Sequence, residues 1–334
     1  MPEAGYELQR LWLRSLRTVD LSLASALDPL RLAASYPQAL ASLARWRPRV
    51  VFTTGGYAAI PVLAAAATLR VPSVLWEGNL MPGRSVRATV RLASVITVSF
   101  GETCALLPGR CYVTGTPIRS FAGAQRAAAR ARLELPPELG CLLVFGGSQA
   151  VRRLNTAVFE ALPAILPGAA IIHVTGHAGH AEALGRREAL PAGLRSHYRP
   201  FAFLGVEMTD ALVAADLLVG RGGSSTLAEA TAVGLPMVVV PYPYAAAHQA
   251  ANAHRLEQAG AARIVPDEQF DAAALIDAAA LLGDGARLDE MHAAARRFGR
   301  PGAAAAVAQL VLALAERGEL PSPESIERAS RAAA

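Results

Sequence analysis

The segment with the clearest potential for ligand chemistry runs from Arg221 to Glu229 and reads RGGSSTLAE. An apolar run, LLVG, precedes it, and a helix is expected to begin near Ser224 or Ser225. The unpaired N–H groups and positive dipole end of a helix N-terminus suit a diphosphate, and Ser and Thr hydroxyls add donors. Glu229 could accept two hydrogen bonds from vicinal ribose hydroxyls. An ordinary N-capped helix with a Glu in its first turns fits the pattern about as well.

Two further clusters follow expected strands. The stretch FGGSQ, with Ser148, forms a strand–glycine–helix turn that could contact phosphate, although a purely structural turn is the stronger interpretation. It is not G-x-G-x-x-G, so it gives no support to dinucleotide redox chemistry. The stretch HQAAN places His248, Gln249 and Asn252 where they could hydrogen-bond sugar hydroxyls. A lone His is more often structural than catalytic.

A carboxylate stands at the end of another expected strand, in the stretch WEGNLMPG. Glu77 could act as a base or as a sugar ligand, and the alternative is a loop that merely precedes a helix. The stretch TTGGY, which ends at Tyr57, has the same two interpretations.

The sequence lacks the residues that several common catalytic mechanisms and binding motifs require. All 32 Lys+Arg residues are Arg, which removes lysine Schiff-base and pyridoxal-phosphate mechanisms. The sequence has no HExxH, DxD or GxSxG pattern and no aromatic–basic stripe for RNA. No nearby acidic or Cys residue completes a metal site with His177 and His180, so no metal site is expected. The net charge of +5 suits phosphates or a membrane surface and is weak evidence for nucleic acid.

The elements that must position these residues alternate short apolar strands with Ala-rich helices, as in an α/β fold with parallel sheets. We expect two open-sheet halves separated by a cleft, with the segment 121–137 as a connection or surface helix. Ligands bind such sheets beyond the carboxyl ends of the strands. The expected strands cover 49–53, 72–77, 94–99, 112–117, 141–145, 170–174, 217–220 and 236–241.

The composition also indicates where the protein is located. The opening residues lack the apolar region of a signal peptide, and prolines and paired glycines break both long uncharged stretches. A soluble or peripheral protein is therefore expected. The three cysteines, Cys104, Cys111 and Cys141, form no CxxC pair and are predicted to be buried, unpaired thiols.

The ordered set TTGGY, TGTPIR, FGGSQ, GRGGSSTLAE and GLPMVVVPYPY…HQ..NA is specific. It resembles the bacterial glycosyltransferase family that adds N-acetylglucosamine to undecaprenyl-pyrophosphoryl-N-acetylmuramoyl-pentapeptide, converting lipid I to lipid II. The resemblance implies a GT-B fold: two Rossmann-like domains with an inter-domain cleft. The expected divisions are 1–118 for the acceptor and membrane side, 119–300 for UDP-GlcNAc, and 301–334 for a helix returning to the first domain.

The resemblance also implies a site for the donor, without metal or cofactor. Glu229 would hold the ribose, and the backbone near Gly205 would bind the uracil beside Met208. The residues implied at the diphosphate are Ser224, Ser225 and Thr226, supported by Ser148 and Arg119. Those implied at the GlcNAc are His248, Gln249 and, from the other domain, Asn79.

The sequence departs from the family at two places. Where the family usually reads HEQN, this chain has WEGN. The family's opening strand and GGTGGH loop, which supply a candidate base histidine, have no counterpart, and a misplaced start codon or a fragment is the expected cause. Glu77 is then the remaining candidate base.

The implied reaction is inverting transfer to the 4-hydroxyl of lipid I at the cytoplasmic face of the plasma membrane. Trp12, Arg84, Arg87 and Arg91 are the candidate membrane contacts, although a solvated surface is as compatible. The alternatives are a GT-B transferase for another lipid acceptor such as diacylglycerol, and a non-catalytic UDP-sugar binding module. An NAD-dependent oxidoreductase is disfavoured.

Overall fold

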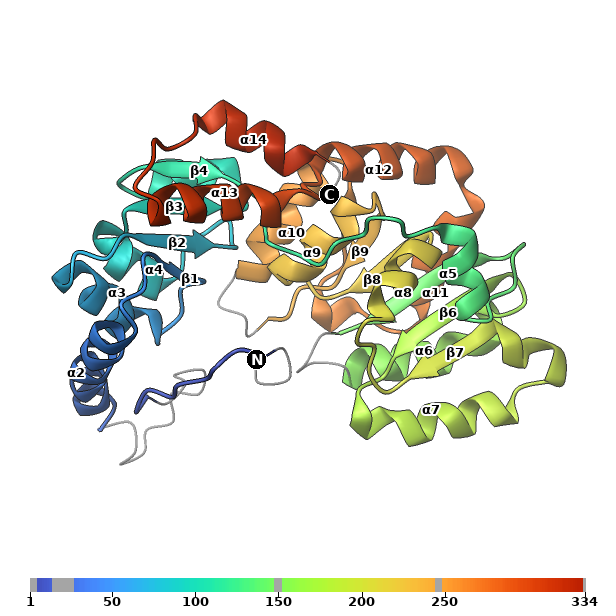
Figure 1. The fold of residues 1–334 in the computed structure, drawn as a ribbon. Helices are drawn as coiled ribbons and strands as arrows, with labels where there is room; N and C mark the ends of the chain where they lie inside the picture. Colours follow the sequence, from blue (N-terminus) through green and yellow to red (C-terminus); the bar gives the residue numbers. More distant parts are fainter. Residues whose placement is uncertain (1–4, 14–26, 147–151, 244–247, 333–334) are drawn as a thin grey trace. The chain divides into compact units, whose positions relative to one another are not determined.

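The computed structural model describes residues 5–13, 27–146, 152–243 and 248–332. The chain divides into two compact units (Figure 1). The first comprises residues 1–115 and 305–329, and the second comprises 116–304 and 330–334.

The first unit is built on a parallel four-stranded sheet in the order β1-β2-β3-β4. Its strands are β1 (Val51–Thr53), β2 (Ser73–Glu77), β3 (Val95–Val98) and β4 (Cys111–Val113). The helical elements are α2 (Asp28–Trp46), α3 (Ala59–Thr68), α4 (Arg84–Thr89), the short 3-10 helices η2 (Val90–Leu92) and η3 (Gly101–Leu106), most of α13 (Ala303–Ala315) and most of α14 (Pro323–Arg331).

Apolar side chains that point alternately to the two sides of each strand cover both faces of this sheet. Leu75 and Ile96 pack with α3 and α4, whereas their strand neighbours Val74 and Val95 pack with α13 and α14. Tyr112 joins the second cluster and donates a hydrogen bond to the carbonyl of Pro321 at 3.1 Å. The carboxyl-terminal helices therefore complete the core of the first unit.

The second unit holds a parallel six-stranded sheet in the order β10-β9-β8-β5-β6-β7. Its strands are β5 (Gly140–Phe145), β6 (Ala169–Val174), β7 (Tyr198–Phe201), β8 (Leu217–Gly220), β9 (Met237–Val239) and β10 (Ala262–Ile264). The helical elements are α5 (Arg126–Arg132), α6 (Arg152–Ile165), α7 (His177–Ala189), η4 (Ala192–His197), α8 (Met208–Ala214), α9 (Ser224–Ala232), α10 (His248–Gln258), η5 (Asp267–Gln269), α11 (Ala272–Ala280), η6 (Leu281–Gly283) and α12 (Gly285–Phe298).

This strand order is that of a doubly wound dinucleotide-type sheet, with β5 as its first strand and β8 as its fourth. Strands β5 to β7 are added in one direction and β8 to β10 in the other, so the topological switch point lies between the parallel strands β5 and β8. Phe145 pairs with Gly220 at the carboxyl ends of the two strands. A Cβ on Gly220 would lie 2.5 Å from the carbonyl oxygen of Phe145, so only glycine allows this approach.

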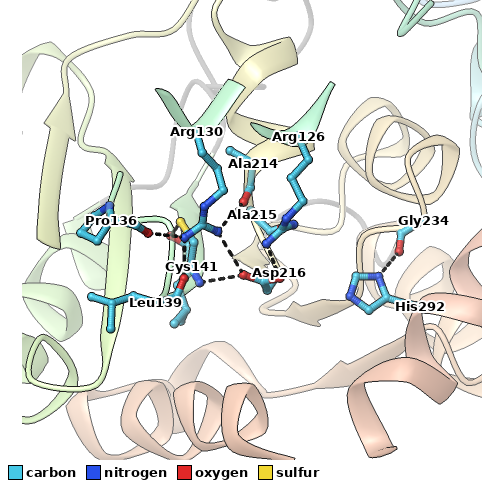
Figure 2. A network of polar contacts seen from close by, with 11 residues as sticks. Arg126, Arg130, Pro136, Leu139, Cys141, Ala214, Ala215, Asp216, Gly234 and His292 are labelled. Carbon is cyan, nitrogen blue, oxygen red and sulfur yellow. Dashed lines mark hydrogen bonds and ion pairs between the residues drawn. The ribbon is translucent and has the colours of Figure 1, made fainter. Parts of the chain in front are cut away.

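The segment 121–137 enters the second unit as the short helix α5, whose arginines hold the amino ends of β5 and β8 (Figure 2). Arg126 and Arg130 form ion pairs with Asp216 at 2.6 and 3.6 Å, and Asp216 accepts the backbone N–H of Cys141 at 2.9 Å. The arginines of this segment therefore attach α5 to the amino ends of β5 and β8 within the second unit.

The prediction of three unpaired thiols was wrong for two of them. Cys104 of η3 and Cys111 of β4 form a disulfide with a Cα–Cα distance of 5.7 Å, seven residues apart in sequence. The error arose because the absence of CxxC spacing says nothing about two elements that the fold brings together. Cys141 is a buried free thiol, as predicted, and burial raises its pKa to about 12.

This pairing predicts a simple thiol count. Denatured, unreduced protein should expose the single thiol of Cys141 to a thiol-reactive dye, because the other two sulfurs are bonded to each other. After reduction the count should rise to three. Three reactive thiols without reductant would contradict the disulfide.

A fully buried histidine joins three elements of the second unit. Nδ1 of His173 (β6) accepts a hydrogen bond of 2.8 Å from the hydroxyl of Tyr198 (β7). Its Nε2 donates a hydrogen bond of 3.0 Å to Oδ1 of Asn155 (α6). The roles follow from Asn155, whose amide nitrogen donates to the carbonyl of Thr175 and leaves its oxygen to accept. Burial lowers the pKa of His173 from 6.5 to about 3, so the ring is neutral in the folded protein.

Stability should therefore fall in mild acid. Between pH 6.5 and 3 the unfolded chain binds a proton at His173 that the folded chain excludes, so unfolding is favoured as the pH drops. This residue should contribute a loss of about 2 kcal/mol between pH 7 and pH 5. Urea titrations of His173→Asn should show a pH dependence of the unfolding free energy that is shallower than that of the parent protein by that amount. Equal slopes for parent and His173→Asn would refute the assignment.

The described residues include one helical stretch, Gly285–Ala315, that has the length and apolar composition to cross a membrane. The GRPG sequence at 299–302 interrupts it between α12 and α13. Ala306 and Leu310 of α13 are fully buried in the core of the first unit. These contacts are those of a core helix.

Candidate functional site

The switch point of the second sheet brings together two of the predicted clusters and the strand that leads into a third. The turn after β8 begins at Arg221, and the strand paired with β8 leads into the FGGSQ stretch. A Cβ on Gly222 would lie 2.8 Å from the carbonyl oxygen of Gln249 and 3.2 Å from the side chain of Val239. The turn after β8 and the start of α10 are thus in backbone contact, which only glycine permits.

The helix that follows this turn presents an open N-terminus. Ser224, Ser225 and Thr226 form the first turn of α9, as predicted, after extended Gly223 at the N-cap (φ −68°, ψ 141°). No side chain caps the helix. The first N–H groups of α9 are consequently available to an anion, and the helix dipole favours one there.

Glu229, Arg119 and Gly205 are joined in one set of contacts. The Nε of Arg119 donates to Oε1 of Glu229 at 2.8 Å, and its Nη1 donates to the carbonyl of Gly205 at 2.8 Å. Gly205 precedes α8, whose first residue, Met208, is buried. Three residues that are distant in sequence, each singled out for the same ligand, therefore lie together.

A second arginine network lies behind the turn, and the sequence interpretation missed it. Arg221 is only 6% exposed, and its Nη1 donates to Oδ1 of Asp267 (2.5 Å) and to the carbonyl of Val240 (3.1 Å). Asp267 also pairs with Arg153 at 3.4 Å. Asp267 thus connects the turn after β8 with the first turn of α6, and only tertiary structure reveals its importance.

The loop before α10 is tied to the same network. The guanidinium of Arg221 lies over the ring of Tyr242, 5.4 Å from its centroid. The backbone N–H of Tyr242 donates to Oε1 of Gln249 at 2.9 Å. Gln249 therefore holds its own loop, whereas His248, the first residue of α10, has a buried Nδ1 without a hydrogen-bond partner among the described residues.

Glu77 and Asn79 lie in the first unit, at the end of β2. Glu77 is 4% exposed, and its Oε1 accepts the backbone N–H and the side-chain amide of Asn79 at 2.9 and 3.0 Å. Its Oε2 accepts the N–H of Gly83 at 2.8 Å. The carboxylate thus holds the loop that carries Asn79. Ser148, which was also predicted to contact the diphosphate, lies outside the described residues.

Comparison with known proteins defines the class. The glycosyltransferase family 28 N-terminal domain matches residues 1–98, and the family 28 C-terminal domain matches residues 141–307. With its two parallel sheets, the chain is a glycosyltransferase with the two-domain GT-B fold.

The chain belongs to glycosyltransferase family 28, in the group of UDP-N-acetylglucosamine–N-acetylmuramyl-(pentapeptide) pyrophosphoryl-undecaprenol N-acetylglucosamine transferases. A relative of that name from Desulforudis audaxviator is 35% identical over 86% of this chain and 80% of its own. One from Chlorobaculum tepidum is 35% identical over 95% of this chain and 87% of its own.

Solved structures agree with this assignment. MurG of Acinetobacter baumannii is similar with a TM-score of 0.69 and 26% identity, over 85% of this chain and 79% of that one. The calicheamicin glycosyltransferase CalG4 shares the fold, with a TM-score of 0.60 and 16% identity, over 86% of this chain and 81% of its own.

Proposed function

We propose that this chain transfers N-acetylglucosamine from UDP-GlcNAc to the 4-hydroxyl of lipid I, forming lipid II. The observation that carries the proposal is the switch point of the second sheet, where an uncapped helix N-terminus adjoins the linked residues Arg119, Gly205 and Glu229. The printed names of its relatives support both the sugar and the acceptor.

The donor would use groups that the fold already orients. Glu229 would accept the ribose hydroxyls, and the backbone near Gly205 would meet the uracil. The first turn of α9 would hold the diphosphate, with Ser148 in support. His248 and Gln249 would contact the GlcNAc, and the unpartnered Nδ1 of His248 is a ready hydrogen-bonding atom.

The chemistry would be a direct displacement. The acceptor oxygen forms a bond to the anomeric carbon while the bond from that carbon to the diphosphate oxygen breaks, and UDP leaves with the electron pair. The acceptor hydroxyl gives its proton to a base. The helix N-terminus at Ser224 and the guanidinium of Arg119 would stabilise the charge that develops on UDP.

Glu77 is our candidate for the base. Glu77→Gln is expected to lower kcat at least about 100-fold with a smaller change in KM, because a general base acts in the transition state.

Asn79→Ala is the matched comparison, because it removes a partner of Glu77 and leaves the carboxylate in place. Suppose that Asn79→Ala lowers kcat as far as Glu77→Gln does, and does not act mainly on KM as the loss of a GlcNAc contact would. Glu77 would then be a residue that positions the loop, and another group would be the base.

Peripheral attachment to the cytoplasmic face of the plasma membrane follows from a lipid-linked acceptor. Arg87 and Arg91 line a surface hollow of about 470 Å³ together with Leu106 and Pro108. Cationic and apolar side chains in one patch suit an interface with lipid headgroups. Trp12 is exposed, and with Arg84 it completes the proposed set.

The deciding assay follows UDP release and lipid product together. Radiolabelled GlcNAc should pass from UDP-GlcNAc to a lipid I analogue, with no requirement for an added divalent ion. Transfer to diacylglycerol instead would reassign the acceptor. Tight UDP-GlcNAc binding without any transfer would indicate a binding module.

A further inference from the structure

Three arginines of the first unit adopt a backbone conformation that arginine rarely takes. Arg47, Arg70 and Arg317 have φ values of 46°, 54° and 55°, in the left-handed region that favours glycine. Arg47 directly follows α2, and Arg70 and Arg317 lie two residues beyond the ends of α3 and α13, at positions where helices commonly place glycine. Among the described residues, only Glu134 shares this feature without being glycine.

The three arginines converge on one surface hollow of about 460 Å³, which Arg49 also lines. We call this set of four the arginine hollow. Its lining also includes one acidic residue, Glu316, so four arginines and one carboxylate-bearing residue line the same hollow. None of the four guanidinium groups forms a hydrogen bond or ion pair with a described residue.

Within the first unit, the arginine hollow is separate from Glu77 and Asn79. Arg49 and Pro72 stand just before β1 and β2, at the amino ends of the strands, whereas Glu77 stands at the carboxyl end of β2. Pro48 and Pro72 restrict the backbone on two sides of the hollow. The lining is therefore formed by short, conformationally restricted segments.

We propose that the arginine hollow binds a phosphate-bearing anion. A helix C-terminus favours one cation, which explains each of the three arginines singly. It explains neither Arg49 nor the presence of four arginines around one hollow, where like charges repel one another without a counter-charge. Guanidinium groups are permanently charged and match phosphate oxygens with paired N–H donors.

The phosphate has two sources that share this chemistry: a soluble diphosphate, or the headgroup of an anionic phospholipid. Exposed apolar side chains accompany two of the arginines: Trp46, 46% exposed, precedes Arg47, and Leu69, 37% exposed, precedes Arg70. Such pairs of aromatic or aliphatic and cationic side chains suit a lipid interface. The experiment therefore needs one arm for each source.

The test variant carries Arg47→Gly, Arg70→Gly and Arg317→Gly. Glycine removes each charge at a position whose conformation it prefers, so the variant should melt at or above the temperature of the parent protein. The control carries Arg186→Gln, Arg287→Gln and Arg297→Gln, which remove the same charge from exposed helices of the second unit. Arg49→Gln is a second, single probe of the hollow.

Pyrophosphate binding is measured by calorimetry, and vesicle binding by sedimentation with phosphatidylglycerol–phosphatidylcholine and with phosphatidylcholine alone. The test variant should lose at least about tenfold in affinity in one arm, increasingly so at low salt, while the control keeps its affinity. Loss in the pyrophosphate arm identifies a soluble ligand, and loss confined to anionic vesicles identifies a headgroup. Unchanged binding in both arms, or an equal loss in the control, would overturn the proposal.

Discussion

Replacing Glu229 with alanine is expected to raise the KM for UDP-GlcNAc about 100-fold. Each hydrogen bond from a ribose hydroxyl to a carboxylate contributes about 1.5 kcal/mol or more, and two of them correspond to roughly that factor. The carboxylate is already held by Arg119 at Oε1, so its position does not depend on the ligand. Glu229→Gln keeps the shape and loses the charge, and it should show an intermediate effect.

Direct titration with UDP separates this effect from catalysis. The dissociation constant for UDP should rise in parallel with KM, because the ribose belongs to both ligands. Glu182→Ala is a suitable control, since Glu182 also pairs with an arginine of the second unit but lies on the exposed face of α7. Unaltered UDP affinity in Glu229→Ala would show that the ribose binds elsewhere.

The second large effect concerns stability together with binding. Asp267→Ala removes the carboxylate that balances buried Arg221, and breaking such a pair from one side costs about 3 kcal/mol or more. Because Asp267 also pairs with Arg153, both turns at the switch point lose their common support. Chemical denaturation should show the loss of stability, and UDP titration should show weaker binding.

Two comparisons make this prediction specific. Asp271→Ala removes a carboxylate that caps α11, only four residues away, and should cost about 1 kcal/mol without changing UDP affinity. In the double variant Arg221→Met, Asp267→Ala, part of the stability should return, because the unbalanced charge is gone. If Asp267→Ala behaves like Asp271→Ala, Asp267 merely stabilises the fold.

Local sequence patterns predicted much of this fold for physical reasons. A buried parallel strand is a short apolar run that ends in a turn, so β5, β6 and β8 could be found from composition alone. Strand β7 (Tyr198–Phe201) contains Arg199 and Pro200 and was missed, because its pairing with β6 outweighs its weak local preference. The strand β10 (Ala262–Ile264) was missed because it has only three residues, one of them Arg263, and so forms no apolar run.

Some residues of the candidate site could likewise be predicted from local sequence, and others could not. Glycines, hydroxyls and Glu229 could be predicted, because a helix N-terminus after a strand has a local signature. Asp267 and the disulfide between Cys104 and Cys111 could not, because each depends on which segments the sheet order places side by side. Ordered motifs identified the ligand groups, and tertiary contacts identified the residues that hold them.

The backbone contact between Gly222 and Gln249 has a consequence for protein engineering. The turn that precedes α9 and the first turn of α10 are too close for either to be reshaped alone. Substitutions at His248 or Gln249 that aim to change the sugar should therefore show strong epistasis with those at residues 222–226. Libraries that vary both segments together should yield altered donor specificity more often than stepwise selection of single substitutions.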